Sequence, residues 1–146
     1  VGLEALSRGA DGVTFVERSG ALCAGLRKTV KALGVEAKCR IVRGDALTTI
    51  GRLGREGRVF DVIWADPPYG RGWAWKVLNV LKENRLLSPD GWLLIETSKS
   101  DELPQETGRL LLKRHDRYGD TAVGYYTRQH RTPSGGAGGG DTLAVL

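Results

Sequence analysis

The sequence is poor in the residues that mark disulfide-rich, metal-binding and membrane proteins. Its 146 residues include two cysteines and two histidines, and Cys23 and Cys39 lack the C-x-x-C spacing of zinc and redox motifs. We therefore expect reduced, buried thiols and no metal site. No apolar run approaches the roughly 20 residues of a membrane span, and no signal peptide is visible. These absences favour one soluble domain of the cytoplasm or of an organelle stroma, with no membrane partner.

Basic residues outnumber acidic ones. Lysine and arginine total 22 against 17 aspartates and glutamates, which gives a net charge of +5 and a pI near 9.5. Most of the basic residues are arginines, whose planar guanidinium suits phosphate groups. The balance fits a polyanionic partner, although surface solubility alone explains a moderate excess equally well.

The most informative stretch is residues 59–70, with the sequence V-F-D-V-I-W-A-D-P-P-Y-G. Its apolar run is typical of a strand buried on both faces of a parallel sheet, and two prolines cannot continue a central strand. Asp66 is therefore expected at the carboxyl edge of the sheet, where open α/β folds bind ligands. The alternative is that D-P-P-Y is only a turn that ends a strand.

These four residues fit the methylation of an exocyclic amine, which is a poor nucleophile because its lone pair is delocalised. The Asp66 carboxylate and the Pro67 carbonyl can accept the two amine hydrogens and stabilise the positive charge that grows on nitrogen. Pro68 stiffens the turn, and Tyr69 can stack on a flat base that is swung out of its helix. The predicted catalytic residues are Asp66, Pro67, Pro68 and Tyr69.

Strands and helices alternate along most of the chain. The patterns predict strands over 13–17, 39–42, 59–65 and 91–97, and helices over 2–9, 20–33, 46–53 and 74–86. Ser19 is expected to cap the second helix, whose apolar face is predicted as Leu22, Leu26, Val30 and Leu33. Residues 88–91 form a predicted turn, and residues 109–117 and 122–128 an antiparallel hairpin. The fold class is thus α/β, with a doubly wound, mostly parallel sheet that ends in a hairpin.

Both ends of the chain differ from the alternating pattern. Residues 131–146 are rich in glycine, so we expect a flexible tail outside a domain that spans residues 1–130. At the other end, Val1 opens the chain in the middle of a helix pattern, and we expect a fragment of a longer domain.

Two further acidic residues end predicted strands. Glu17 and Asp45 would share the crevice of Asp66, and acidic residues at such strand ends hold ribose hydroxyls in dinucleotide folds. Each of them alone is equally well explained as a helix cap or a solvated turn residue.

The motif order over residues 1–129 resembles a known family. The motifs are G-L-E-A-L-S-R-G-A, V-x-F-V-E-R, G-D-A, F-D-V-I-W-A-D-P-P-Y and G-W-L-L-I-E. Their order is similar to that of the S-adenosylmethionine-dependent class I methyltransferases, most closely the RsmD-type small-subunit ribosomal RNA (guanine-N2) methyltransferases.

The resemblance implies S-adenosylmethionine as cofactor, ribosomal RNA or the small-subunit particle as substrate, and a monomeric enzyme. It assigns Glu17 to the ribose hydroxyls of the cofactor and Asp45 and Ala46 to its adenine. The full set of predicted cofactor-binding residues is Gly2, Glu17, Arg18, Asp45, Ala46 and Asp66. Of the family's glycine-rich loop, D-x-F-x-G-x-G-x-x-G, only Gly2 remains, and the first strand is missing. We therefore expect the centre of the sheet to be unfilled and the chain to bind cofactor weakly.

Other functions remain open at this point. The same chemistry serves adenine N6 in DNA and glutamine amides in proteins. A DNA enzyme usually adds a recognition domain for which this chain has no room, and a glutamine methyltransferase would favour asparagine in place of Asp66. A non-catalytic fragment that binds RNA is the alternative from another class.

Overall fold

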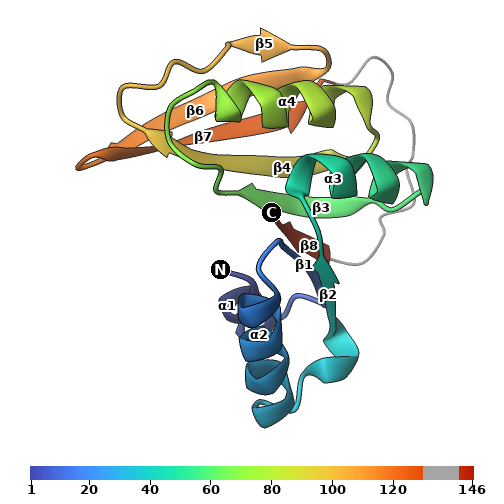
Figure 1. The fold of residues 1–146 in the computed structure, drawn as a ribbon. Helices are drawn as coiled ribbons and strands as arrows, with labels where there is room; N and C mark the ends of the chain where they lie inside the picture. The colour runs from blue at the N-terminus through green and yellow to red at the C-terminus, as the bar shows by residue number, and fades with distance from the viewer. Residues whose placement is uncertain (130–141) are drawn as a thin grey trace.

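The computed structural model describes residues 1–129 and 142–146, which form helices around one eight-stranded sheet (Figure 1). The helices are α1 (Gly2–Ser7), α2 (Gly20–Ala32), the 3₁₀ helix η1 (Glu36–Lys38), α3 (Ala46–Arg55) and α4 (Trp73–Glu83). The strands are β1 (Gly12–Glu17), β2 (Cys39–Arg43), β3 (Phe60–Ala65), β4 (Leu87–Ser98), β5 (Glu106–Thr107), β6 (Leu110–Tyr118), β7 (Thr121–Arg128) and β8 (Thr142–Val145).

The sheet confirms the predicted doubly wound α/β class. Its strand order is β2-β1-β8-β3-β4-β7-β6-β5, with β2, β1, β8, β3 and β4 parallel and β7, β6 and β5 antiparallel. The predicted hairpin is the pair β6 and β7. Because the parallel strands run in one direction, β1, β2, β3 and β8 all end at the same edge of the sheet.

Strand β8 corrects two predictions. Residues 142–146 were expected in a flexible tail and the centre of the sheet was expected to be unfilled, yet β8 lies there between β1 and β3 (Figure 1). Thr142 pairs with Gly12 of β1, and Val145 pairs with Trp64 of β3. The Thr142 amide also donates a hydrogen bond of 3.1 Å to Oδ2 of Asp61. The rest of the predicted tail, residues 131–141, lies outside the described residues.

The side chains of β8 explain why it occupies a central position. Leu143 and Val145 pack with β1, α1 and α2 on one face, while Ala144 joins the larger core under α3 and α4 on the other. Leu143 and Ala144 are buried. Alternating apolar side chains of this kind satisfy both faces of a buried parallel strand, and they outweigh the glycine-rich sequence that precedes them.

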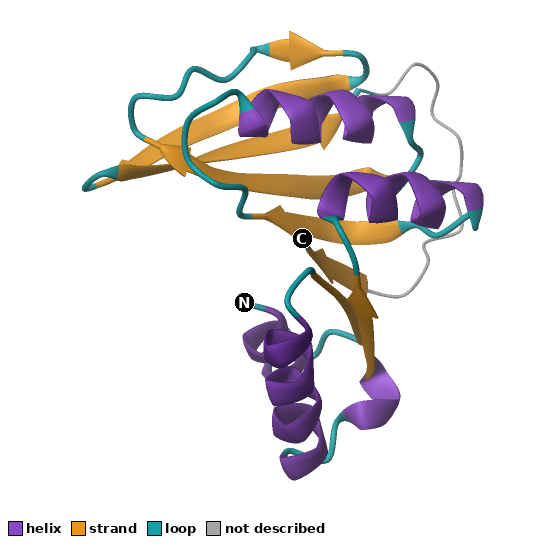
Figure 2. Ribbon diagram, in the orientation of Figure 1, coloured by secondary structure: helices purple, strands orange, loops and turns teal. Residues whose placement is uncertain are grey.

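The helices cover both faces of the sheet, with α1 and α2 on one side and α3 and α4 on the other (Figure 2). Ser19 caps α2 as predicted, since its hydroxyl accepts a hydrogen bond from the Leu22 amide. The predicted apolar face of α2 is partly wrong, because Leu22 and Leu33 are 61% and 60% exposed. Val30 of the predicted face is buried, and so is Cys23, which was not part of it. They lie seven residues apart, and so share one side of the helix.

The turn predicted at residues 88–91 is wrong, because these residues belong to β4. Phe60 pairs with Leu87 and Val62 with Trp92, so extra residues of β4 bulge out opposite β3. Gly91 fits this bulge, where a Cβ atom would lie 2.7 Å from Cδ1 of Leu87 and 3.0 Å from a backbone oxygen of β3. A bulge adds residues to one strand without ending the ladder.

Cys23 and Cys39 are free thiols, the first buried and the second partly buried. Burial raises the pKa of the Cys39 thiol above its ordinary value. Residues 1–129 and 142–146 contain no group of histidine, cysteine and acidic side chains placed to hold a metal ion. Within the same residues, none of the helices has the length and apolar character needed to cross a membrane.

Candidate active site

A hollow of about 330 Å³ lies at the carboxyl edge of the parallel strands. It is bounded by the ends of β1, β2, β3 and β8 and by the first turns of α3 and α4. The residues that line it are Val16, Glu17, Arg18, Gly44, Asp45, Ala46, Leu47, Ala65, Asp66, Pro67, Pro68, Trp73, Val77 and Leu146. This is the edge at which the sequence placed the site.

Most of the predicted site residues meet in this hollow. The seven that line it are Glu17, Arg18, Asp45, Ala46, Asp66, Pro67 and Pro68. Gly2 and Tyr69 do not line it. Gly2 begins α1 and packs against the ring of Phe15, which a Cβ atom at this position would strike. The close approach of α1 to β1 therefore accounts for this glycine without a ligand.

Glu17 ends β1 with one carboxylate oxygen engaged. Its Oε1 accepts a hydrogen bond of 2.9 Å from the Ser19 amide, and its backbone oxygen accepts one of 3.0 Å from the Gly44 amide. These bonds fix the ends of β1 and β2 beside each other. Oε2 has no hydrogen-bond partner in the described part of the chain, so it can accept a hydroxyl of a ligand.

Asp45 is both a helix cap and a lining residue. Its Oδ2 accepts hydrogen bonds from the amide and the hydroxyl of Thr48, at 3.0 and 3.1 Å, and it caps α3. The hydrogen bond from the Thr48 amide is the main reason that the pKa of Asp45 lies below its ordinary value. The helix-cap explanation of Asp45 is therefore confirmed, and its role at a ligand stays a prediction.

Asp66 follows β3 and is held by the end of β8. Its amide donates a hydrogen bond of 3.3 Å to the backbone oxygen of Leu146, whose own amide donates one of 2.8 Å to the oxygen of Trp64. Partial burial raises the pKa of Asp66, and the nearby charge of Glu96 adds to the shift. The residue is exposed overall, so solvent still reaches the carboxylate, and a positive charge beside it would favour its ionised form.

Tyr69 lies outside the hollow, between the end of β3 and β4. It is 48% exposed, and its hydroxyl donates a hydrogen bond of 2.9 Å to Oε1 of Glu96. This bond is the largest cause that raises the pKa of Tyr69. The next residues, 70–72, have left-handed φ values of 72°, 54° and 69°, which suits the two glycines of this loop. The ring is held at its hydroxyl end, and about half of the side chain is open to solvent.

Seven residues that line the hollow were missed by the sequence reasoning. Three of them, Val16, Gly44 and Ala65, directly precede a predicted site residue. Leu47, Trp73 and Val77 line the hollow from α3 and α4, and Leu146 lines it from the end of β8. Trp73 had a visible signal, because it is an aromatic residue directly after the glycine loop that follows D-P-P-Y. Leu146 had none, because its place depends on the pairing of β8.

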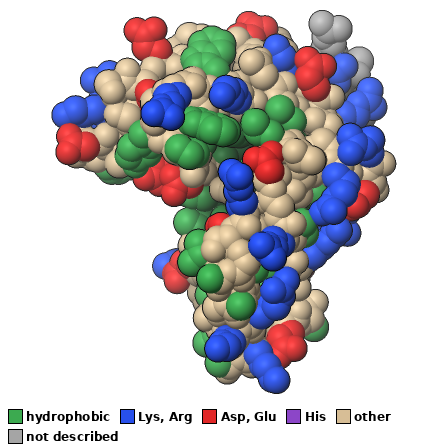
Figure 3. Space-filling view, in the orientation of Figure 1, with side chains coloured by type: hydrophobic (Ala, Val, Ile, Leu, Met, Phe, Trp, Pro, Cys, Tyr) green, Lys and Arg blue, Asp and Glu red, His purple; other side chains and the backbone are tan. Residues whose placement is uncertain are grey.

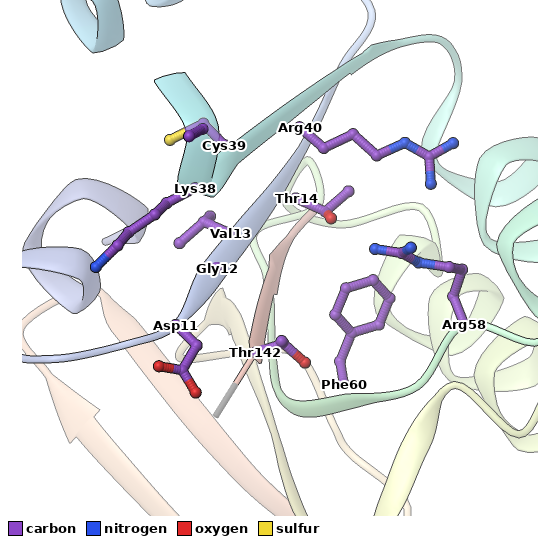
Figure 4. Close-up of a pocket in the computed structure, with 11 residues that line it drawn as sticks. Asp11, Gly12, Val13, Thr14, Lys38, Cys39, Arg40, Arg58, Phe60 and Thr142 are labelled. Carbon is purple, nitrogen blue, oxygen red and sulfur yellow. The ribbon is translucent and has the colours of Figure 1, made fainter. Parts of the chain in front are cut away.

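A smaller hollow of about 220 Å³ lies at the opposite edge, where the parallel strands begin. Figure 4 shows its lining, with the side chains of Arg40, Arg58 and Phe60 in the right-hand half of the view. The charge of Arg40 is partly neutralised by an ion pair with Glu56, in which nitrogen and oxygen lie 3.4 Å apart. None of the predicted site residues lines this second hollow, so the carboxyl-edge hollow remains the candidate active site.

Comparison with known proteins places the chain in a family. The family model described as "Conserved hypothetical protein 95" matches residues 1–127. The chain belongs to this family. The Rossmann-like class I methyltransferase fold expected from the motifs is the fold observed.

Two relatives from this family align over most of the chain. The "Putative rRNA methyltransferase YlbH" of Bacillus subtilis is 30% identical over 129 residues, which are 88% of this chain and 70% of the relative. Ribosomal RNA small subunit methyltransferase D of Escherichia coli is also 30% identical over 129 residues, but the match covers 63% of its length. The solved structure of a "putative methylase" from Haemophilus influenzae superposes with a TM-score of 0.76 at 25% identity, covering 88% of this chain and 80% of that one.

Proposed function

We propose that the protein transfers a methyl group from S-adenosylmethionine to the N2 amine of a guanine in small-subunit ribosomal RNA. The observation that carries this proposal is one hollow that unites Glu17 and Asp45 with Asp66 and Pro67. The names of the family relatives support the RNA substrate. The guanine amine follows from the aspartate in D-P-P-Y and from the resemblance of the motif order.

The residues of the hollow fit the adenosine part of the cofactor. Glu17 has a free carboxylate oxygen for the ribose hydroxyls, and Asp45 and Ala46, which the resemblance assigns to the adenine, line the same hollow. Leu47 and Val77 add apolar surface, as expected of a pocket for a flat ring. When bound, the cofactor supplies an electrophilic methyl group on sulfur.

Asp66 and Pro67 act on the amine. They accept its two hydrogens, so the nitrogen lone pair points at the methyl carbon. The new N–C bond would use the methyl group that the cofactor supplies, and the electrons of the former bond to sulfur would remain with the cofactor. One N–H proton must then leave, and the Asp66 carboxylate is the nearest proposed acceptor, with a pKa raised in the direction that suits this task. Tyr69 stacks on the base.

A cluster of arginines supports an RNA partner. Arg85, Arg109 and Arg128 line one hollow of about 220 Å³ between α4, β4 and the β6–β7 hairpin. The charges of Arg109 and Arg85 contribute to lowering the pKa of Arg128, after burial. Such mutual repulsion is relieved by an anion. Basic side chains also gather along the right-hand side of the molecule in Figure 3. Phosphate groups of RNA match both features.

Methyl transfer to small-subunit particles tests the proposal. Particles from a bacterial strain that lacks the family enzyme would be incubated with tritiated S-adenosylmethionine, and the RNA digested to nucleosides. Label in N2-methylguanosine is expected. Label confined to DNA or protein would show that the substrate is wrong, and binding of RNA without any transfer would favour the non-catalytic alternative. Monomeric state and cytoplasmic location remain predictions.

A further inference from the structure

Glu96 stands beside the proposed amine site without a role in the mechanism of methyl transfer. It lies on β4 directly after Ile95, which pairs with Ala65, so it is level with Asp66 on the neighbouring strand. Its Oε1 accepts a hydrogen bond of 2.9 Å from the hydroxyl of Tyr69. It forms no ion pair with a lysine, arginine or histidine of residues 1–129 and 142–146. A partly buried carboxylate with no cation has capacity for another donor.

We propose that Glu96 is a specificity residue that accepts the N1–H of the target guanine. The inference rests on the proposed function, since it places the guanine amine at Asp66. Tyr69 occupies one oxygen of Glu96 and so orients its carboxylate, which leaves Oε2 for the base. The charge of Glu96 contributes to the raised pKa of Asp66, which agrees with the closeness of the two carboxylates.

Two adjacent carboxylates select a particular arrangement of hydrogen-bond donors. Guanine presents N1–H directly beside its N2 amine, so Asp66 and Glu96 would both meet donors. Adenine presents a bare N1 acceptor beside its N6 amine, and a glutamine amide presents its own carbonyl oxygen. Each of these would turn a lone pair toward Glu96. Because a site built for a donor strongly rejects analogues that lack it, Glu96 would exclude adenine and glutamine.

Binding of labelled nucleotides separates the roles of the two carboxylates. The probes are GMP, which has both N1–H and the amine, IMP, which has only N1–H, and AMP, which has neither at these positions. Equilibrium dialysis of the full chain is run with saturating S-adenosylhomocysteine, which fills the proposed adenosine pocket so that AMP does not bind there. The measurement needs no methyl transfer, so its outcome is independent of activity. The variants are Glu96→Gln, Asp66→Asn and the matched control Glu102→Gln, which removes a carboxylate charge from an exposed residue of the β4–β5 connection.

The wild type should prefer IMP to AMP by about tenfold, the scale of one well-placed base contact. Glu96→Gln should abolish this preference. Asp66→Asn should weaken the binding of GMP but keep the preference for IMP over AMP. Glu102→Gln should bind all three nucleotides as the wild type does. Far-UV circular dichroism checks folding, and Glu96→Ala gives a second test of the same loss. The inference is overturned if the wild type binds IMP and AMP equally, or if both Glu96 variants keep the preference. Absence of N2-methylguanosine in the particle assay would instead contradict the proposed function itself.

Discussion

Strand β8 holds the two parts of the sheet together, so a buried side chain on it should control stability. In the described part of the chain, β1 and β3 meet only through β8, which pairs with both. Leu143 is 5% exposed and packs with Val13 and Phe15. The variant Leu143→Ala leaves the backbone pairing possible but removes this contact.

The expected loss follows from the buried volume. Replacement of leucine by alanine removes three carbons, each worth about 0.8 kcal/mol when buried, and leaves a cavity that adds to the cost. We expect the free energy of unfolding to fall by about 3 kcal/mol, a large share of the roughly 5–15 kcal/mol of a typical domain. Urea unfolding followed by circular dichroism measures the change, which should lower the midpoint by roughly 1–3 M.

Leu22→Ala is the matched control, because Leu22 is 61% exposed on α2. Its effect should stay within about 0.5 kcal/mol, as for most surface substitutions. If Leu143→Ala costs no more than Leu22→Ala, β8 does not occupy the centre of the sheet, and Leu146 does not hold the amide of Asp66.

Three further predictions concern the site and its RNA. Tyr69→Ala should weaken binding of the RNA base by about 1–3 kcal/mol and Tyr69→Phe much less, because stacking needs the ring; equal effects on the KM for RNA would argue against stacking. The transfer rate should fall as acid protonates Asp66, whose pKa is raised, and in Glu96→Gln this fall should move to lower pH; coincident pH–rate profiles would contradict the coupling. Arg109→Ala should reduce the slope of log affinity against log salt by about one in filter-binding titrations, and an unchanged slope would exclude a phosphate contact.

The D-P-P-Y end of β3 was predictable because it depends on residues that are adjacent in the sequence. An apolar run followed by two prolines must leave a central strand, and parallel strands bring Glu17, Asp45 and Asp66 to one edge whatever the details of packing. The cap at Ser19 follows in the same way from the residue and its neighbours. These features carry most of the candidate site.

The features that were missed depend on contacts between distant segments. The residues of β8 carry a short apolar pattern, but no feature of the neighbouring sequence indicates that they pair with β1 and β3. Ser88 to Gly91 has the composition of a turn, yet the pairing of Leu87 and Trp92 with β3 on either side keeps it within a bulged strand. The bond from Tyr69 to Glu96 joins residues 27 positions apart and requires the register of β3 against β4. Tertiary pairing overrides local preference in each case.

The central claim is that the carboxylate of Asp66 accepts hydrogens of the reacting amine. Single-turnover methyl transfer by Asp66→Ala, beside a titration of S-adenosylmethionine, tests it most directly. We expect a transfer step slower by on the order of a hundredfold or more, with cofactor affinity nearly unchanged. Asp120→Ala, at the exposed turn of the β6–β7 hairpin, serves as control and should keep the wild-type rate. An Asp66→Ala protein with an undiminished transfer step would contradict this role and leave D-P-P-Y as a turn at the end of a strand.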